Sequence, residues 1–330
     1  MMTILAMVAL VLLLVVVGFV VYFLTRYIPI VSNLFLDVTV KTRSGEDAEV
    51  PGETVRFKTG DGVGLVGTLT PGAPGAPVVV FCHEFSSSRR AASRYARFLM
   101  DAGVRVFTFD FRGHGDSENP GEYVSRLWPT KAEVMDAQAA IEYVRSRPET
   151  VGSPVGFLGV SRGGSVALCA AARDSRIRAV VTDGAYSSYR TLRDYIYKWV
   201  SIFVRARWMY AYSPEFLYQF VTWVAMKFSE LRMRGRVVSV DRAVKRMKVP
   251  VLMVHGERDN YLSLDHVRYL AGLNERQVQL WVVPEANHNE AVDLAPEEYR
   301  ARLTEFFLTH LTGEKSTVAP DPWKRTTATA

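Results

Sequence analysis

Residues 154–164 read Pro-Val-Gly-Phe-Leu-Gly-Val-Ser-Arg-Gly-Gly. The first half is a short apolar run suited to a buried strand, and residues 165–173 are mostly small and apolar, as in a helix packed against a sheet. A chain that passes from strand to helix within about one turn leaves no room for side chains beside Ser161, so Gly159 and Gly163 meet a steric requirement. The stretch predicts a strand, a tight turn that presents Ser161 at the sheet edge, and a helix.

A serine flanked by glycines is a weak signal by itself, because chance places the pattern G-x-S-x-G in roughly one chain in ten of this length. A glycine-rich turn without chemistry is the alternative interpretation. The neighbouring residues favour a nucleophile turn, because a predicted strand precedes it, a predicted helix follows it, and Gly164 suits close packing of that helix on the sheet.

Apolar runs on both sides of this stretch predict the rest of a sheet. An antiparallel hairpin is expected first, and a series of buried strands follows, separated by segments of helical periodicity. This alternation predicts one α/β domain at residues 53–312, with a mostly parallel sheet wound on both faces. The other expected strands are 53–57, 65–70, 78–82, 104–109, 177–181, 249–254 and 278–283, and the expected helices include 87–102 and 296–311.

The first residues of the chain predict a membrane span. Residues 4–24 contain no charged side chain, and at about 1.5 Å per residue a helix of this length crosses the roughly 30 Å hydrocarbon layer of a bilayer. A cleaved signal peptide is the competing interpretation, but the run is long for a signal core, no basic residue precedes it, and it lacks a convincing small-residue cleavage site. We expect an uncleaved transmembrane anchor at residues 1–27 and a connector at residues 28–52.

Basic residues near this span favour one orientation. Arg26, Lys41 and Arg43 follow the apolar run, and none precedes it, so the positive-inside rule favours a folded domain on the cytoplasmic side. The cysteines agree with a reducing compartment, because Cys82 and Cys169 stand in no metal-binding or redox spacing. We interpret them as small buried apolar residues rather than as a disulfide.

Two loops that follow late strands carry the partners that a nucleophilic serine needs. A serine hydroxyl is a poor nucleophile at neutral pH, so acyl transfer requires a base for its proton and an acid that orients the base. The first loop contains Asp259 and the second contains His288. Since parallel strands end at one edge of a sheet, Ser161, Asp259 and His288 can meet there. Asp183, at the end of the strand after the Ser161 helix, is the alternative acid.

Together these segments resemble the α/β-hydrolase superfamily, in its serine-dependent esterase, lipase and peptidase branch. The resemblance covers approximately residues 53–311 and includes the chain order nucleophile, acid, histidine. His83 and the residues after it look like the His-Gly oxyanion loop, residues 110–117 like the Asp-x-Arg-Gly-x-Gly loop, and residues 255–259 like the His-Gly-x-x-Asp segment. The resemblance implies an α/β-hydrolase fold in which Ser161 is the nucleophile, His288 the general base and Asp259 the acid.

The resemblance also implies an oxyanion hole made by two backbone N–H groups, those of Arg162 and Phe85. The family usually has glycine where this chain has Glu84, and glycine permits backbone angles that glutamate rarely adopts. The contribution of Phe85 therefore depends on how the loop accommodates Glu84.

No cofactor and no catalytic metal are expected. The six histidines form no His-Glu-x-x-His spacing, and we interpret His83 and His255 as structural residues that bond nearby backbone groups rather than as ligands.

A long aromatic insertion at about residues 186–248 lies where the family carries a lid or cap. From residue 190 to 248 it has thirteen Lys or Arg against four Asp or Glu, an excess larger than the +6 of the whole chain. One interpretation is a helical cap whose rings pack on the core while the basic residues face solvent. The other is that the cap lies on an anionic membrane surface and receives a lipid-like acyl substrate. The basic residues concerned include Arg205, Arg207, Arg232 and Arg234.

These observations predict a membrane-anchored serine hydrolase that cleaves a carboxylic ester or thioester of a small acyl or lipid substrate. A peptidase of the same fold is the nearest alternative, and a catalytically silent, hydrolase-like binding scaffold is the alternative from another class. Nucleic acid is not expected as a partner, because the basic residues alternate with bulky apolar ones and no nucleic-acid motif accompanies them. Residues 313–330 have no apolar period and are expected to form a disordered tail.

Overall fold

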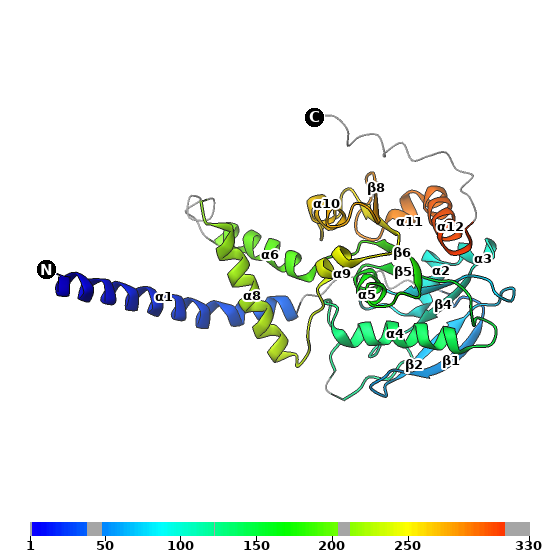
Figure 1. Cartoon of the computed structure of the whole chain (residues 1–330), viewed down its shortest axis with the longest axis horizontal. Helices are drawn as coiled ribbons and strands as arrows, with labels where there is room; N and C mark the ends of the chain where they lie inside the picture. Colours follow the sequence, from blue (N-terminus) through cyan, green and yellow to red (C-terminus); the bar gives the residue numbers. More distant parts are fainter. Residues whose placement is uncertain (1, 38–47, 122, 204–211, 314–330) are drawn as a thin grey trace. The chain divides into compact units, whose positions relative to one another are not determined.

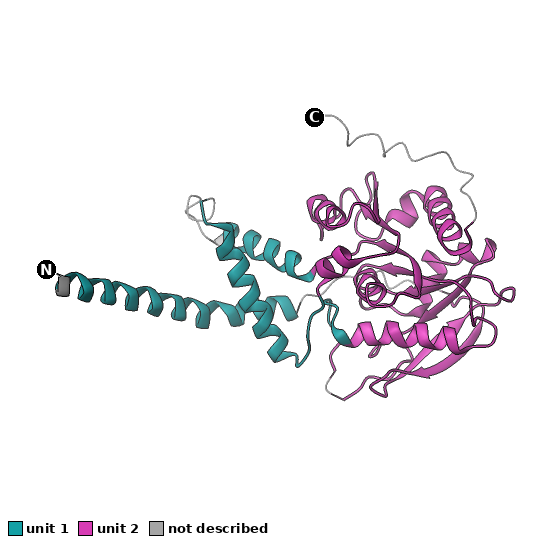
Figure 2. Cartoon of the chain, viewed as in Figure 1, with its two compact units in different colours: residues 1–41, 126–131, 188–238 teal, residues 42–125, 132–187, 239–330 magenta. Residues whose placement is uncertain are grey.

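The computed structural model describes residues 2–37, 48–121, 123–203 and 212–313 (Figure 1). They fall into two compact units (Figure 2). Unit 1 comprises residues 1–41, 126–131 and 188–238, and unit 2 comprises residues 42–125, 132–187 and 239–330. Except for Gly313, the expected tail lies outside the described residues.

Unit 2 is built on one eight-stranded sheet with the order β1-β2-β4-β3-β5-β6-β7-β8. β1 and β2 form the expected antiparallel hairpin, β2 pairs antiparallel with β4, and all other neighbours are parallel. The predicted mostly parallel sheet is confirmed. The strands are β1 Glu53–Lys58, β2 Gly64–Leu69, β3 Val78–Cys82, β4 Arg105–Phe109, β5 Val155–Val160, β6 Ile177–Asp183, β7 Val251–Gly256 and β8 Val278–Val283.

Helices cover both faces of this sheet (Figure 1). On one face, α2, α3 and α12 place Tyr95, Leu99 and Phe307 in a single apolar cluster with strand residues. On the other face, α5 packs against β3, β5 and β6, and Tyr143 of α4 stacks on Phe57. The helices are η1 Arg89–Ala91, α2 Ala92–Tyr95, α3 Phe98–Asp101, α4 Lys131–Ser146, α5 Arg162–Ala171, α9 Val240–Arg246, α10 Leu264–Gly272, α11 Ala291–Leu294 and α12 Pro296–Thr312.

The single helix expected over residues 87–102 is wrong, because this segment forms the short pieces η1, α2 and α3. The backbone of Arg89 is engaged by tertiary hydrogen bonds. Its N–H donates to Asp110 Oδ1 at 2.6 Å, and its carbonyl oxygen accepts from Thr108 Oγ1 at 2.8 Å. Side chains that bond backbone groups in this way compete with a regular helix. Both cysteines, by contrast, are free and buried as predicted.

Unit 1 contains three long helices, α1 Met2–Leu36, α6 Ser188–Phe203 and α8 Glu215–Arg232, and α1 and α6 both pack against α8. The segment Ile4–Leu36 is long and apolar enough to cross a membrane, judged by length and composition. Within the expected insertion, α6 and α8 are helical as predicted. The helix α9, also expected in the insertion, packs on α5 within unit 2.

The helix α1 continues through Pro29 into the segment expected to be a connector. Its last turns belong to the packed part of unit 1. Phe35 stacks on Trp128 with ring centroids 4.1 Å apart, and Ser229 Oγ donates to Ser32 Oγ at 2.9 Å. The expected boundary at residue 27 therefore falls inside one continuous helix.

Candidate active site

Ser161 lies at the turn between β5 and α5. Since β5 ends at Val160 and α5 begins at Arg162, Ser161 alone makes the turn, with φ 51° and ψ −115°. A left-handed φ at a non-glycine residue costs about 1–3 kcal/mol and persists only where the surroundings impose it. Here they do: a Cβ atom on Gly163 would lie 2.1 Å from the Cys82 carbonyl oxygen, and one on Gly159 would lie 2.6 Å from the Gly163 carbonyl oxygen.

The three residues predicted to act together lie in one chain of hydrogen bonds. Ser161 Oγ is 2.9 Å from His288 Nε2, and His288 Nδ1 is 2.6 Å from Asp259 Oδ2. Asp259 follows β7 and His288 follows β8. The carboxyl ends of three parallel strands thus bring together residues that are distant in the sequence.

The surroundings of Asp259 keep its carboxylate in one orientation. Its second oxygen, Oδ1, accepts the backbone N–H groups of Tyr261 and Leu262, each at 2.8 Å. Burial raises the pKa of this carboxyl, but the hydrogen bond from His288 and the electrostatic attraction between the two side chains lower it more, so the pKa lies below its ordinary value. An ionised carboxylate only accepts hydrogen bonds, so Nδ1 of His288 carries a proton and Nε2 is left to accept the Ser161 hydroxyl proton.

Asp183, the alternative acid, occupies a different place. It is fully buried at the end of β6, and its backbone carbonyl oxygen accepts the N–H of Ser161 at 2.7 Å. Burial raises the pKa of its carboxyl to about 7. Since His288 Nδ1 bonds Asp259, the geometry favours Asp259 over Asp183 as the residue that orients the imidazole.

The loop after β3 is held by His83, which is structural as predicted. His83 Nε2 accepts the backbone N–H of Phe111 at 3.2 Å, so Nδ1 carries the proton and donates to the Glu84 carbonyl oxygen at 2.7 Å. Burial, and then the charge of Arg162, lower the pKa of His83 to about 3, which keeps the ring neutral. Because C=O and N–H of a trans peptide point in opposite directions, the bond to Glu84 also fixes the direction of the Phe85 N–H.

Glu84 does not need the backbone angles of a glycine. The left-handed residue of this loop is Ser86, with φ 57°, and Glu84 is not among the residues with positive φ. Within the described part of the chain, the Phe85 N–H donates to no carbonyl oxygen. The replacement of glycine by Glu84 is therefore compatible with a second N–H donor at Phe85.

The Arg162 side chain is a feature of the site that sequence reasoning missed. Its fully buried guanidinium lies 5.4 Å from the ring centroids of both Phe85 and Phe111. Nη1 is 3.5 Å from Glu133 Oε1, and Nη2 is 3.3 Å from His114 Nε2. The residue whose N–H begins α5 thus also holds the ring of Phe85 through a cation–π contact. The only signal in the sequence is a charged residue directly after the predicted nucleophile.

The other histidine singled out from the sequence, His255, is also structural. Its Nε2 donates to the Leu262 carbonyl oxygen at 3.2 Å, and burial lowers the pKa of its ring. Among the residues that the structure describes, no group of three or more His, Cys, Asp or Glu side chains could hold a metal ion.

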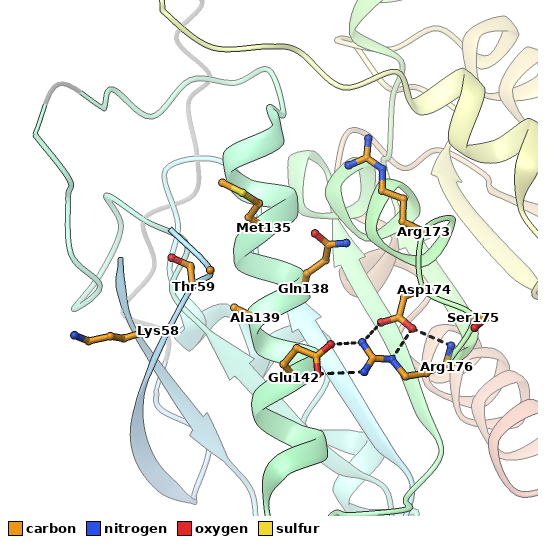
Figure 3. Close-up of a pocket in the computed structure, with 11 residues that line it drawn as sticks. Lys58, Thr59, Met135, Gln138, Ala139, Glu142, Arg173, Asp174, Ser175 and Arg176 are labelled. Carbon is orange, nitrogen blue, oxygen red and sulfur yellow. Dashed lines mark hydrogen bonds and ion pairs between the residues drawn. The ribbon is translucent and has the colours of Figure 1, made fainter. Parts of the chain in front are cut away.

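A polar hollow of about 630 Å³ lies elsewhere on unit 2 (Figure 3). It is lined by residues of α4, by the end of β1 and by residues 173–176. Among the charged residues that line it, Arg176 bonds both Asp174 and Glu142. None of Ser161, Asp259 and His288 lines it, so the hollow is not part of the candidate active site.

Comparison with known proteins identifies the family of this chain. The chain is 25% identical over 268 residues to the uncharacterized protein YfhR of Escherichia coli K12, covering 78% of this chain and 81% of YfhR. It is 32% identical over 130 residues to the thiohydrolase AneE of Aspergillus aculeatus, covering 39% of this chain and 40% of AneE. The structure of the Pyrococcus furiosus esterase Pf2001 is similar with a TM-score of 0.60 and 26% identity, covering 83% of this chain and 96% of the esterase. Residues 71–302 match the family model, and the chain therefore belongs to the alpha/beta hydrolase family.

Proposed function

We propose that this protein is a membrane-anchored serine hydrolase that cleaves a carboxylic ester or a thioester through an acyl-serine intermediate. The observation that carries the proposal is the chain of hydrogen bonds from Ser161 through His288 to Asp259. Similarity to a P. furiosus esterase and, over a shorter stretch, to a thiohydrolase favours an ester or thioester over a peptide bond.

In the proposed reaction, Ser161 Oγ attacks the acyl carbonyl carbon while His288 Nε2 takes the hydroxyl proton. The backbone N–H groups of Arg162 and Phe85 stabilise the oxyanion, each typically by about 3 kcal/mol. The tetrahedral intermediate then expels the alcohol or thiol, which takes the proton from His288. A water molecule, deprotonated by His288, attacks the acyl-serine ester, and its collapse releases the acid and returns the proton to Ser161. Asp259 stabilises the imidazolium in both steps.

The anchor proposed at the N-terminus is α1. Its large apolar side chains between Ile4 and Phe23 are 37–68% exposed, which is unfavourable in water and favourable in hydrocarbon. The helix runs without a break from the apolar segment into the turns whose Ser32 and Phe35 pack within unit 1, and this continuity supports an uncleaved anchor over a signal peptide. We place the hydrolase on the cytoplasmic side and propose a small acyl or lipid substrate at an anionic bilayer surface.

Labelling with a fluorophosphonate probe tests the serine mechanism. The parent protein should be labelled and Ser161→Ala should not, and a panel of esters with graded chain lengths, matched thioesters and a peptide should then define the bond that is cleaved. A folded parent protein that reacts with neither probe nor esters would support the silent scaffold and refute the proposal.

Protease protection in sealed membrane vesicles tests the orientation of the hydrolase. Digestion of the domain from the non-cytoplasmic side would reverse the proposed orientation.

A further inference from the structure

The helix α8 is apolar on two opposite faces. One face is buried and comprises Tyr218, Thr222, Ala225, Met226 and Ser229. Its partners belong to unit 1: Tyr218 lies against Tyr197 of α6 with ring centroids 5.4 Å apart, and Ser229 bonds Ser32 of α1. The packing of unit 1 accounts for this face.

The opposite face, here called the aromatic face, is formed by Phe216, Phe220, Trp223 and Leu231. At about 100° per residue these four side chains fall within a sector of about 80°. They are 64%, 45%, 54% and 77% exposed, respectively. A row of exposed aromatic side chains on one helix face marks a surface that contacts another apolar phase.

We propose that the aromatic face of α8 is inserted into the interfacial layer of the bilayer that α1 spans. This inference rests on the membrane anchoring proposed above and goes beyond it, since an anchored domain could also stand clear of the lipid. Trp and Phe side chains favour this layer, where an apolar ring can lie among the acyl chains near the headgroups.

The packing of α8 on α1 allows the aromatic face to reach the membrane surface. Ser32 follows Leu24, the end of the apolar run, by about 12 Å of helix, and Phe216 precedes Ser229 by about 20 Å, at about 1.5 Å per residue. In Figure 2, α8 crosses α1 obliquely. The first turns of α8 lie nearer to the N-terminal end of α1, and the last turns of α8 lie nearer to its C-terminal end. The end of α8 that carries Phe216 and Phe220 therefore leans toward the proposed membrane surface.

Apolar contact, rather than charge, is the interaction that this face offers. Arg232, which ends α8, donates to Asn33 and Ser32 within unit 1. Lys227, on the same face as Trp223, pairs with Glu230 at 2.7 Å. The two cations of α8 are thus already bonded inside the protein, so we expect insertion in neutral as well as in anionic bilayers.

Depth-dependent quenching in vesicles tests this inference on the full chain. Trp223→Cys and Phe220→Cys are labelled separately with an environment-sensitive fluorophore, and Glu297→Cys on α12, where the side chain is 90% exposed, serves as the matched control. Both native cysteines are buried, and burial raises the pKa of Cys169 to about 12, so labelling is confined to the introduced thiol.

In neutral phosphatidylcholine vesicles, lipid-borne nitroxide should quench the labels at 220 and 223 at least threefold more strongly than the label at 297, and aqueous iodide should show the reverse order. Equal quenching at all three sites, or lipid quenching only in anionic vesicles, would overturn the inference.

Extraction with alkaline carbonate distinguishes failure of the proposed anchor from failure of the proposed insertion. Loss of the protein from the membrane would refute the anchor and the insertion together, whereas retention with water-exposed labels would refute only the insertion. Fluorophosphonate labelling of Ser161 reports separately on the serine mechanism.

Discussion

Replacement of Asp259 by asparagine changes one atom of the candidate site, and the structure determines the result. The backbone N–H groups of Tyr261 and Leu262 both donate to Oδ1 at 2.8 Å, so an amide at position 259 keeps its oxygen there. The amide NH2 then takes the place of Oδ2, 2.6 Å from His288 Nδ1. Two donors cannot face each other, so the imidazole must carry its proton on Nε2, where it can no longer accept the proton of Ser161.

The wrong tautomer removes the general base while the fold is kept. We expect Asp259→Asn to lower kcat by about 10⁴-fold, which corresponds to about 5.5 kcal/mol of transition-state stabilisation. Because the two backbone bonds survive, the thermal unfolding temperature should change little. Hydrolysis of a soluble short-chain ester gives kcat and KM, and the rate of fluorophosphonate labelling gives the reactivity of Ser161 independently.

Asp183→Asn is the matched control, because it removes the other carboxyl group near the site. It should change kcat by less than about tenfold, because Asp183 does not bond the imidazole Nδ1. The reasoning is refuted if Asp259→Asn stays within tenfold of the parent protein while Asp183→Asn loses most of the activity. That outcome would make Asp183 the acid.

Three further predictions follow from burial and packing. Arg162→Met removes the cation beside Phe85 and takes away the positive charge 3.5 Å from the buried Glu133, which keeps its hydrogen bond from Tyr123. The variant should destabilise unit 2 by about 3–5 kcal/mol and lower kcat by about 10²-fold, and adding Glu133→Gln should restore the unfolding temperature more than it restores kcat. Burial raises the pKa of Asp183 to about 7, so the folded protein keeps a proton that the unfolded chain loses above roughly pH 4, and stability falls as pH rises from roughly 4 to 7. In urea unfolding, Asp183→Asn should remove a loss of about 2.7 kcal/mol at pH 8 relative to pH 5, at about 1.36 kcal/mol per pH unit between pH 5 and pH 7. Deletion through Leu24 should leave the thermal unfolding temperature of unit 1 unchanged in detergent, whereas deletion through Leu36 removes the stacking of Phe35 on Trp128 and should lower that temperature by several degrees. Equal unfolding temperatures of the two deletion variants would contradict the packing of the last turns of α1.

The sheet and the three polar residues of the candidate site could be predicted because their signals are local or follow a general rule. Residues 78–82 form an unbroken apolar run, and β3 has the same bounds. Ser161, Asp259 and His288 each follow a parallel strand, and parallel strands end at a common edge whatever the intervening loops do. The role of Gly159 and Gly163 could be predicted because the turn at Ser161 leaves no room for a side chain at either position.

The remaining features depend on contacts between distant residues. The segment 87–102 has helical periodicity, but Asp110 and Thr108 engage the backbone of Arg89 and break the helix. The burial of the Arg162 guanidinium depends on Phe85, Phe111 and Glu133, which approach it from three different segments. A local sequence pattern does not indicate contacts between residues that are distant in the sequence.

The contact between Ser32 and Ser229 also has a consequence for biosynthesis. The two residues are 197 positions apart, and at about 5 to 20 residues per second a ribosome needs about 10 to 40 s to deliver the second after the first. The end of α1 therefore waits for its protein partner long after it has left the ribosome, and if α1 is the anchor proposed above, the bilayer shelters the helix during that interval. Insertion into the bilayer would come first and closure of unit 1 last, so a chain translated far from a membrane would carry an uncovered apolar helix through most of its synthesis.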